Sequence, residues 1–424
     1  MNMKLRNIPF SPPDMTEAEA KEVREAILSG WITTGPRTKK LETQISEYVH
    51  TDKTVCLNSA TAALEMVLHL LDIQPDDEVI VPAYTYTATA SVTQHVGCKL
   101  VMVDSQKDSV EMDYDKLAEV ITERTKVICP VDLGGIVANY DRVYDIVEAK
   151  KGLFRPSNAL QAKIGRIVVS ADCAHSFGAS QKGMMAGEIA DFSSFSFHAV
   201  KNFTTAEGGA LTWKLAFGNE VVPTVVDYLP TVPKKEGETW NELLYRLSQL
   251  FSLHGQNKDA LAKTKLGAWE YDIIGPWYKC NMTDIMAALG LVQFERYPSI
   301  LQRRYDIVER FNAALKDLPV AVLNHRDADH CSSHHLYIAR LLGKTREETN
   351  KVIEMMAERG IATNVHYKPL PMMTAYKALG FDIKDYPNAY HLFENEITLP
   401  LHTKLTDDDV EYVITNFVDI IKNL

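Results

Sequence analysis

Short apolar runs separated by helical patterns dominate the first half of the chain. Each run has four to six residues and is rich in β-branched or aromatic side chains, and segments such as 115–121 between them repeat apolar residues at helical spacing. Short strands alternating with helices predict a mostly parallel sheet covered on both faces, an α/β fold in which ligands gather at strand ends. The runs are 78–81, 99–103, 125–130, 167–170 and 192–197.

Two changes in this pattern predict the domain organisation. From about residue 223 to 267 the periodicity weakens and proline, glycine and charged residues accumulate, which indicates a loop-rich insertion with helical pieces. A long helical segment, 283–314, precedes a second region where strands and helices alternate again. We therefore expect an N-terminal arm and large domain in residues 1–314, and a smaller C-terminal α/β domain in residues 315–424.

Composition excludes several classes of function. A net charge of -11 without a basic stripe argues against a nucleic-acid-binding surface, which needs clustered Lys and Arg. Residues 1–10 lack the apolar core of a signal peptide and no apolar stretch is long enough to span a bilayer, so we expect a cytoplasmic protein. The six cysteines form no C-x-x-C pair, so no metal site or redox centre is indicated, and we expect reduced and partly buried thiols.

Lys201 is the first candidate for chemistry, because it follows an apolar run and precedes two glycines. Partial burial would lower its pKa and release a neutral amine as a nucleophile, although most lysines at such places are solvated charges at strand ends. Asp172 ends another apolar run, 29 residues earlier. Pyridoxal 5'-phosphate needs this pair, a carboxylate that faces the protonated ring nitrogen and a lysine that forms the imine at the aldehyde.

A phosphate-binding turn is the third requirement of that cofactor. Ser59, Ala60 and Thr61 open a helical pattern, and the free N–H groups and positive dipole end of a helix favour a dianion. An ordinary helix N-cap is the alternative interpretation of the same residues. The local sequence does not decide between the two.

Seven motifs occur in order along nearly the whole chain and resemble those of the sugar aminotransferases of the DegT/DnrJ/EryC1/StrS family. That family is a branch of the fold-type I pyridoxal-phosphate enzymes. The resemblance implies a large domain with a mostly parallel, seven-stranded sheet containing one antiparallel strand, followed by a smaller domain. The motifs lie at residues 29–36, 58–64, 81–89, 172–175, 194–203, 281–285 and 365–367.

The resemblance also implies roles for residues around the cofactor. Lys201 corresponds to the Schiff-base lysine, Asp172 to the partner of the ring nitrogen, and Ser196 to a phosphate donor beside the turn that begins at Ser59. Tyr86 falls where relatives stack an aromatic ring on the pyridine face, and His175 where they place Gln or His near the phenolic oxygen. Without the family, Tyr86 would be interpreted as core and His175 as a hydrogen-bonded polar group.

Other positions point to substrate and to a second subunit. Lys279 lies in the segment that, in relatives, crosses to the partner's phosphate; many members have Asn at this position and Arg at the position of Asn281. The lysine retains a charge for the phosphate, and the resemblance then implies an obligate homodimer. Thr33 and His366 match segments that border the sugar pocket in relatives, and His366 has a purely structural alternative.

The implied reaction is transfer of an amino group from L-glutamate to a nucleotide-linked keto sugar, in the biosynthesis of amino sugars or surface polysaccharides. We expect a UDP- or dTDP-linked 4-keto-6-deoxy hexose, with the sugar, nucleotide and ketone position left open. A sugar dehydratase of a related branch would carry histidine in place of Lys201. A C–N lyase, a regulator, or a noncatalytic nucleotide-sugar-binding protein in which Lys201 and Asp172 are strand-end charges remain alternatives.

Overall fold

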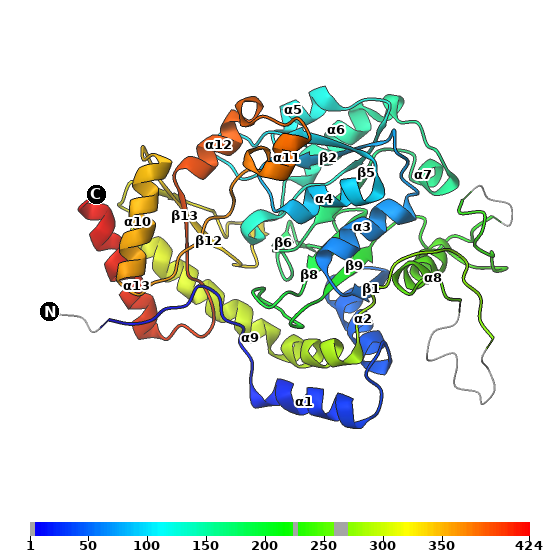
Figure 1. Cartoon of the computed structure of the whole chain (residues 1–424), viewed down its shortest axis with the longest axis horizontal. Helices are drawn as coiled ribbons and strands as arrows, with labels where there is room; N and C mark the ends of the chain where they lie inside the picture. Colours follow the sequence, from blue (N-terminus) through cyan, green and yellow to red (C-terminus); the bar gives the residue numbers. More distant parts are fainter. Residues whose placement is uncertain (1–4, 224–227, 258–269) are drawn as a thin grey trace.

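A seven-stranded sheet forms the centre of the molecule (Figure 1). The computed structural model describes residues 5–223, 228–257 and 270–424. The strand order is β1-β9-β8-β5-β4-β2-β3, and β9 alone runs antiparallel to both of its neighbours, which confirms the predicted fold class. The strands are β1 (Lys53–Leu57), β2 (Glu78–Pro82), β3 (Lys99–Val103), β4 (Thr125–Ile128), β5 (Val168–Asp172), β8 (Phe192–Ser196) and β9 (Gly209–Trp213).

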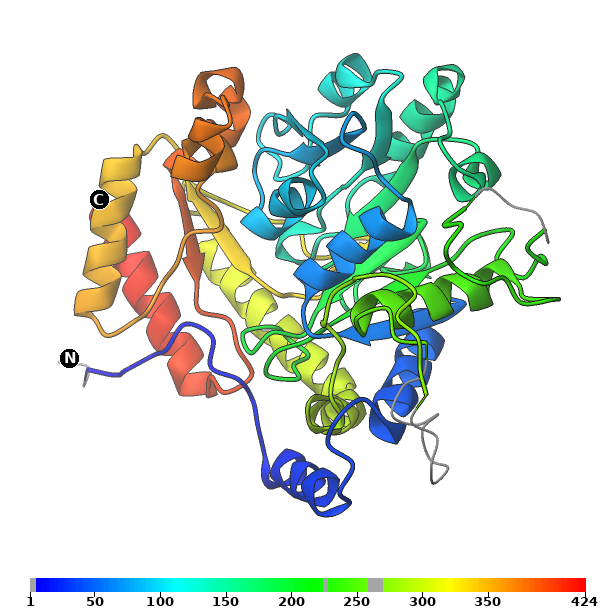
Figure 2. The ribbon, with the colours of Figure 1, turned by 45° about the vertical axis from the view of Figure 1, so that its right-hand side comes forward.

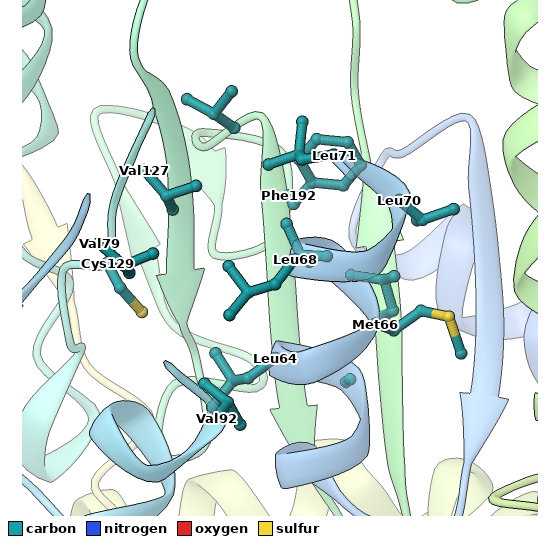
Figure 3. Packing of buried hydrophobic residues seen from close by; sticks show 14 of the residues in the cluster. Leu64, Met66, Leu68, Leu70, Leu71, Val79, Val92, Val127, Cys129 and Phe192 are labelled. Carbon is teal, nitrogen blue, oxygen red and sulfur yellow. The ribbon is translucent and has the colours of Figure 1, made fainter. Parts of the chain in front are cut away.

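Helices cover both faces of this sheet because successive strand residues point to opposite sides. On β2, Val79 belongs to one buried cluster and its neighbour Ile80 to another. Leu64 and Leu68 of α3 pack toward Val79, Val127 and Phe192 on the first face (Figure 3). The helices of this part are α1 (Glu17–Leu28), α2 (Pro36–Tyr48), α3 (Ala60–Leu70), α4 (Thr87–Val96), α5 (Tyr114–Val120), α6 (Tyr140–Ala149), α7 (Ala159–Ile164) and α8 (Trp240–Ser252).

The long helix α9 (Asp284–Leu315) leads from the large sheet to a second, smaller one (Figures 1 and 2). That sheet is antiparallel, and it packs with α9 and with Ile8 of the N-terminal arm in a third buried cluster. Its strands are β10 (Val320–Val322), β12 (Tyr337–Leu341) and β13 (Glu396–Leu399), and its helices are α10 (Arg346–Glu358) and α13 (Asp407–Lys422).

Part of the C-terminal region returns to the core of the large sheet. Leu370, Tyr376 of α11 (Thr374–Ala378) and Leu392 of α12 (Pro387–Glu394) belong to the cluster that contains Val79. A small sheet also links the two regions, since β6 (Ser180–Gln181) pairs with β7 (Met184–Met185) and with β11 (His330–Cys331). The two predicted domains therefore share buried contacts. The boundary between residues 314 and 315 stays a prediction.

The predicted insertion at 223–267 contains a helix in the part that the structure describes. Residues 224–227 and 258–267 of it lie outside the described part of the chain. The described part contains α8, which begins at a capping box between Thr239 and Glu242 and fully buries Leu243 and Leu247 against the core. This helix is one of the helical pieces expected within the insertion, and it belongs to the buried core.

Two simpler expectations concern the thiols and the membrane. All six cysteines are free, and Cys56, Cys98, Cys129 and Cys173 are buried, as predicted. Among the helices of the described residues, none combines the length and the apolar character needed to cross a bilayer.

Candidate active site

A cavity of about 480 Å³ opens at the ends of the strands, between the large sheet and the segment 364–367. Nine of the residues expected to bind cofactor or substrate line it, although they come from five separate segments of the chain. These are Ser59, Ala60, Thr61, Tyr86, Asp172, His175, Ser196, Lys201 and His366.

Lys201 lies in the loop that connects β8 to β9, five residues beyond the last strand residue Ser196, and not at the strand end itself. The loop is tied back by bonds from Lys201 N–H to the His198 carbonyl, 2.9 Å, and from Thr205 N–H to the Phe197 carbonyl, 2.9 Å. Burial lowers the pKa of Lys201 to about 8, an effect that the negative charge of Asp172 partly offsets. A neutral amine is therefore accessible near physiological pH.

Asp172 is the last residue of β5 and is only 5% exposed. Its two oxygens each accept a hydrogen bond, one from Thr89 Oγ1 at 2.7 Å and one from Ala174 N–H at 3.1 Å. Burial raises the pKa of this carboxyl, whereas these hydrogen bonds and the charge of Lys201 oppose the shift. The carboxylate is held rigidly and its strongest electrostatic partner would be a cation in the cavity, such as a protonated ring nitrogen.

The start of α3 fits a phosphate group. Ser59 Oγ accepts from Ala62 N–H at 3.1 Å and the Ser59 carbonyl accepts from Ala63 N–H at 3.2 Å. The N–H groups of Ala60 and Thr61 have no acceptor within the helix, because the first turn of any helix lacks preceding carbonyls. Both residues line the cavity, so these donors and the positive helix end are available to an anion.

Gly209 and Ser196 complete the phosphate site at the start of α3, which we call the phosphate cradle. A side chain at Gly209 would lie 2.4 Å from the Ser59 carbonyl carbon and 2.5 Å from Ala60 N, so only glycine lets β9 approach the start of the helix. Ser196 Oγ accepts a long bond from His198 N–H, 3.4 Å, and its own proton remains free to donate to a phosphate oxygen.

His175 has a defined protonation state in this pocket. Its Nδ1 accepts from Gly134 N–H at 3.1 Å, so a neutral ring carries its proton on Nε2, which lies 3.2 Å from the Tyr367 hydroxyl. Burial lowers the pKa of His175 well below its ordinary value, and the nearby charge of Lys201 adds to the effect. The Tyr367 hydroxyl accepts this hydrogen bond from His175 Nε2, and its own proton is free to be donated to another acceptor.

Tyr86 is 59% exposed, which excludes the core interpretation of this residue. It caps the start of α4 at the cavity wall, and its ring centroid lies 5.8 Å from that of Tyr367. The flat face of a conjugated ring is the type of surface that such a side chain stacks against.

Two of the predicted residues do not line this cavity within the described part of the chain. The Thr33 carbonyl accepts from Asp284 N–H at 3.0 Å, at the start of α9. Lys279 contacts Asn281 Oδ1 in a segment held beside the phosphate cradle by a 2.8 Å bond from Asn58 N–H to the Cys280 carbonyl. The substrate role of Thr33 and the phosphate role of Lys279 stay predictions.

Sequence reasoning missed His335, whose ring centroid lies 4.4 Å from that of His175. Its Nδ1 donates to Asn202 Oδ1 at 2.9 Å, and Asn202 Nδ2 donates to the Ser333 carbonyl at 2.6 Å. The available signal was the polar run from Ser332 to His335 directly before a buried strand, but no local pattern connects it to Lys201 or His175.

Comparisons with known proteins agree with this geometry. A model of the DegT/DnrJ/EryC1/StrS aminotransferase family matches residues 13–215 and 234–418. The spore coat polysaccharide biosynthesis protein SpsC of Bacillus subtilis is 32% identical over 423 residues, covering 98% of this chain and 97% of SpsC. The two matched segments contain all of the cavity residues named above, and the residues between the segments that are unmatched are 216–233.

Solved structures give the same result. The pyridoxal-phosphate form of a putative sugar aminotransferase, Spr1654 from Streptococcus pneumoniae, is 54% identical with a TM-score of 0.90 and covers 99% of each chain. PseC of Helicobacter pylori, an aminotransferase of pseudoaminic acid biosynthesis, is 25% identical with a TM-score of 0.81, covering 99% of this chain and 100% of PseC.

Proposed function

Because the chain belongs to the DegT/DnrJ/EryC1/StrS family of pyridoxal-phosphate-dependent sugar aminotransferases, we propose that its cavity transfers an amino group from L-glutamate to a keto sugar carried on a nucleotide. The observation that supports this most is the buried pair of Lys201 and Asp172, which share a cavity with the open start of α3. A noncatalytic binding protein has no use for a buried amine facing a buried carboxylate, since both are costly to bury.

The residues divide into four tasks toward the cofactor. Asp172 would face the ring nitrogen and favour its protonated form, Lys201 would supply the amine for the aldehyde, and Tyr86 and His175 would lie against the ring. Ser59, the N–H groups of Ala60 and Thr61, and Ser196 would hold the phosphate. When bound, pyridoxal phosphate supplies the electron sink for the reaction.

Lys201 then acts as acid and base. With the cofactor bound, the Lys201 amine would be the base that takes a proton from the donor's α-carbon and the acid that gives it back. A pKa near 8 leaves a large fraction of the amine neutral, which this step requires. The same Lys201 amine would move the proton in the opposite direction when the keto sugar is the acceptor.

We propose a UDP- or dTDP-linked 4-keto-6-deoxy hexose as acceptor, and a role in polysaccharide biosynthesis. The relative SpsC is named for the biosynthesis of a spore coat polysaccharide, which supports this role, and PseC is named for the biosynthesis of pseudoaminic acid. A panel of nucleotide-linked 3-keto and 4-keto sugars, with glutamate and mass detection of the amino product, is expected to select a 4-keto-6-deoxy sugar. Selection of a 3-keto sugar would correct the acceptor, and amination of none would contradict the nucleotide-sugar proposal.

We also propose that the active unit is a homodimer in which Lys279 reaches the partner's phosphate site. The support is that Lys279 lies outside its own chain's cavity yet in a segment beside the phosphate cradle. The Lys201→Ala and Lys279→Ala variants should each lose activity at limiting cofactor. Mixed in a co-expressed sample, they should recover about a quarter of wild-type activity, because half of the random dimers contain one intact site.

Complementation needs both residues to come from different chains. If Lys279 served its own chain, every site in the mixed dimer would carry one change and no recovery would occur. Lys182→Ala, which removes an exposed lysine paired with Asp141, is the matched control for the loss of a lysine and should keep wild-type activity on its own.

A further inference from the structure

A second buried carboxylate, Glu396, lies behind the cavity wall and has no part in the cofactor chemistry. It is fully buried on β13. Its Oε2 accepts from the backbone N–H of His366 at 3.0 Å, and its Oε1 accepts from Thr398 Oγ1 at 2.5 Å. Two donors therefore point at this carboxylate, one from the segment 364–367 that borders the cavity and one from β13 itself.

The hydroxyl of Thr398 connects Glu396 to the ring of His366. A hydroxyl has a single proton, and Thr398 gives it to Glu396. The 2.9 Å contact between Thr398 Oγ1 and His366 Nδ1 must then be donated by the imidazole. Nδ1 of His366 carries the proton, and Nε2 of a neutral ring is left as a hydrogen-bond acceptor.

The ring is neutral because of where it lies. Burial lowers the pKa of His366 to about 3, with a further contribution from the charge of Lys201. Burial also raises the pKa of Glu396 to about 7, opposed by the bonds from Thr398 and His366 and by the charge of Arg346. Above about pH 8, Glu396 is ionised. The directions of the two hydrogen bonds that Thr398 Oγ1 makes, with Glu396 and with His366 Nδ1, are then fixed.

The surroundings hold the imidazole in one orientation. Asn364 and Thr398 exchange backbone bonds of 3.1 and 2.8 Å, and the Tyr84 hydroxyl donates to the His366 carbonyl at 2.8 Å. The ring of Phe10 stacks on the imidazole with centroids 5.6 Å apart. His366 lines the cavity, and its Nε2 bonds to no group in residues 5–223, 228–257 and 270–424.

We propose that Glu396, acting through Thr398, is a positioning residue that presents His366 Nε2 to a hydroxyl group of the sugar substrate. A sugar hydroxyl donates a proton to such an acceptor, whereas the carboxylates of glutamate offer only lone pairs and would be disfavoured there. The inference rests on the proposed function and narrows it, since it assigns His366 to the sugar half of the reaction.

The test is Glu396→Gln in the holoenzyme at pH 8.5. The backbone N–H of His366 still requires an acceptor, so the new amide keeps its oxygen there and turns its NH₂ toward Thr398. Thr398 then accepts from the amide and donates to His366 Nδ1, which moves the imidazole proton to Nε2. Nitrogen NMR of histidine-labelled protein, with His366 assigned from a His366→Asn variant, reports the tautomer directly.

Kinetics supply the second readout. With a UDP-linked 4-keto-6-deoxy hexose, Glu396→Gln should lower kcat/KM for the sugar about tenfold, the usual effect of one lost hydrogen bond. The rate of the half-reaction with glutamate should stay within twofold of wild type. Thr398→Ser keeps the hydroxyl and should match wild type in both readouts, whereas Thr398→Val should resemble Glu396→Gln kinetically.

Three results would overturn the inference: a proton on Nε2 of His366 in the wild type, an unchanged tautomer in Glu396→Gln, or equal losses in both half-reactions. A protein that shows the expected tautomers but does not react with glutamate would refute the proposed function and leave the positioning by Glu396 intact.

Discussion

Replacing Lys201 with alanine is expected to abolish amino transfer, with kcat at least about 1,000-fold below wild type. The change removes both the amine that bonds to the cofactor and the base that moves the proton at the donor's α-carbon. Lys201 lies in the β8–β9 loop, and within the described residues its side chain makes no hydrogen bond or ion pair that holds the sheet, so the fold should persist. Steady-state rates with glutamate, and borohydride trapping followed by peptide mass mapping, measure the two roles separately.

The matched control is again Lys182→Ala, where an exposed lysine loses only its pairing with Asp141. It should retain wild-type rates and trap cofactor on the peptide that contains Lys201. Trapping on a different lysine in the wild type, or a Lys201→Ala protein within tenfold of wild-type activity, would refute the assignment.

Asp172→Asn is expected to lower kcat about 100- to 1,000-fold while weakening cofactor binding much less. The amide has nearly the volume of the carboxyl and can still accept from Thr89 or Ala174, so the pocket should keep its form. It carries no charge, however, and no longer favours a proton on the ring nitrogen. Single-turnover rates with glutamate and a cofactor titration distinguish the two effects.

An exposed acidic residue provides the comparison for Asp172. Asp141→Asn removes a carboxylate on the surface of α6 and should leave both rate and cofactor affinity unchanged. If Asp172→Asn kept more than about a third of wild-type kcat, the electrostatic role of the buried carboxylate would be wrong.

Local pattern was sufficient for the strands that lie in the parallel part of the sheet. The run 99–103 matches β3 at both ends, and the helix expected over 283–314 occurs as Asp284–Leu315. Strands β1 and β9 were not predicted, because their pairing is antiparallel and joins residues about 160 positions apart. Helix α8 is one of the helical pieces expected within 223–267, but the proline- and charge-rich residues that precede it did not indicate its burial in the core.

The site residues divide in the same way, into those that a local pattern predicted and those that it did not. Lys201 and Asp172 were found because each is a charged residue next to an apolar run, a local conflict that burial at a site explains. Glu396 and Thr398 gave no such signal, since their partner His366 lies about 30 residues away in sequence and meets them only through the pairing of Asn364 with Thr398. Tertiary contacts, not sequence spacing, created that arrangement.

Addition of L-glutamate to the purified, cofactor-loaded protein tests the central claim, that the cavity around Lys201 and Asp172 carries out amino transfer. The absorbance of the lysine-bound cofactor should fall, and one equivalent of 2-oxoglutarate should form per active site before any sugar is added. An unchanged spectrum with no 2-oxoglutarate would contradict it.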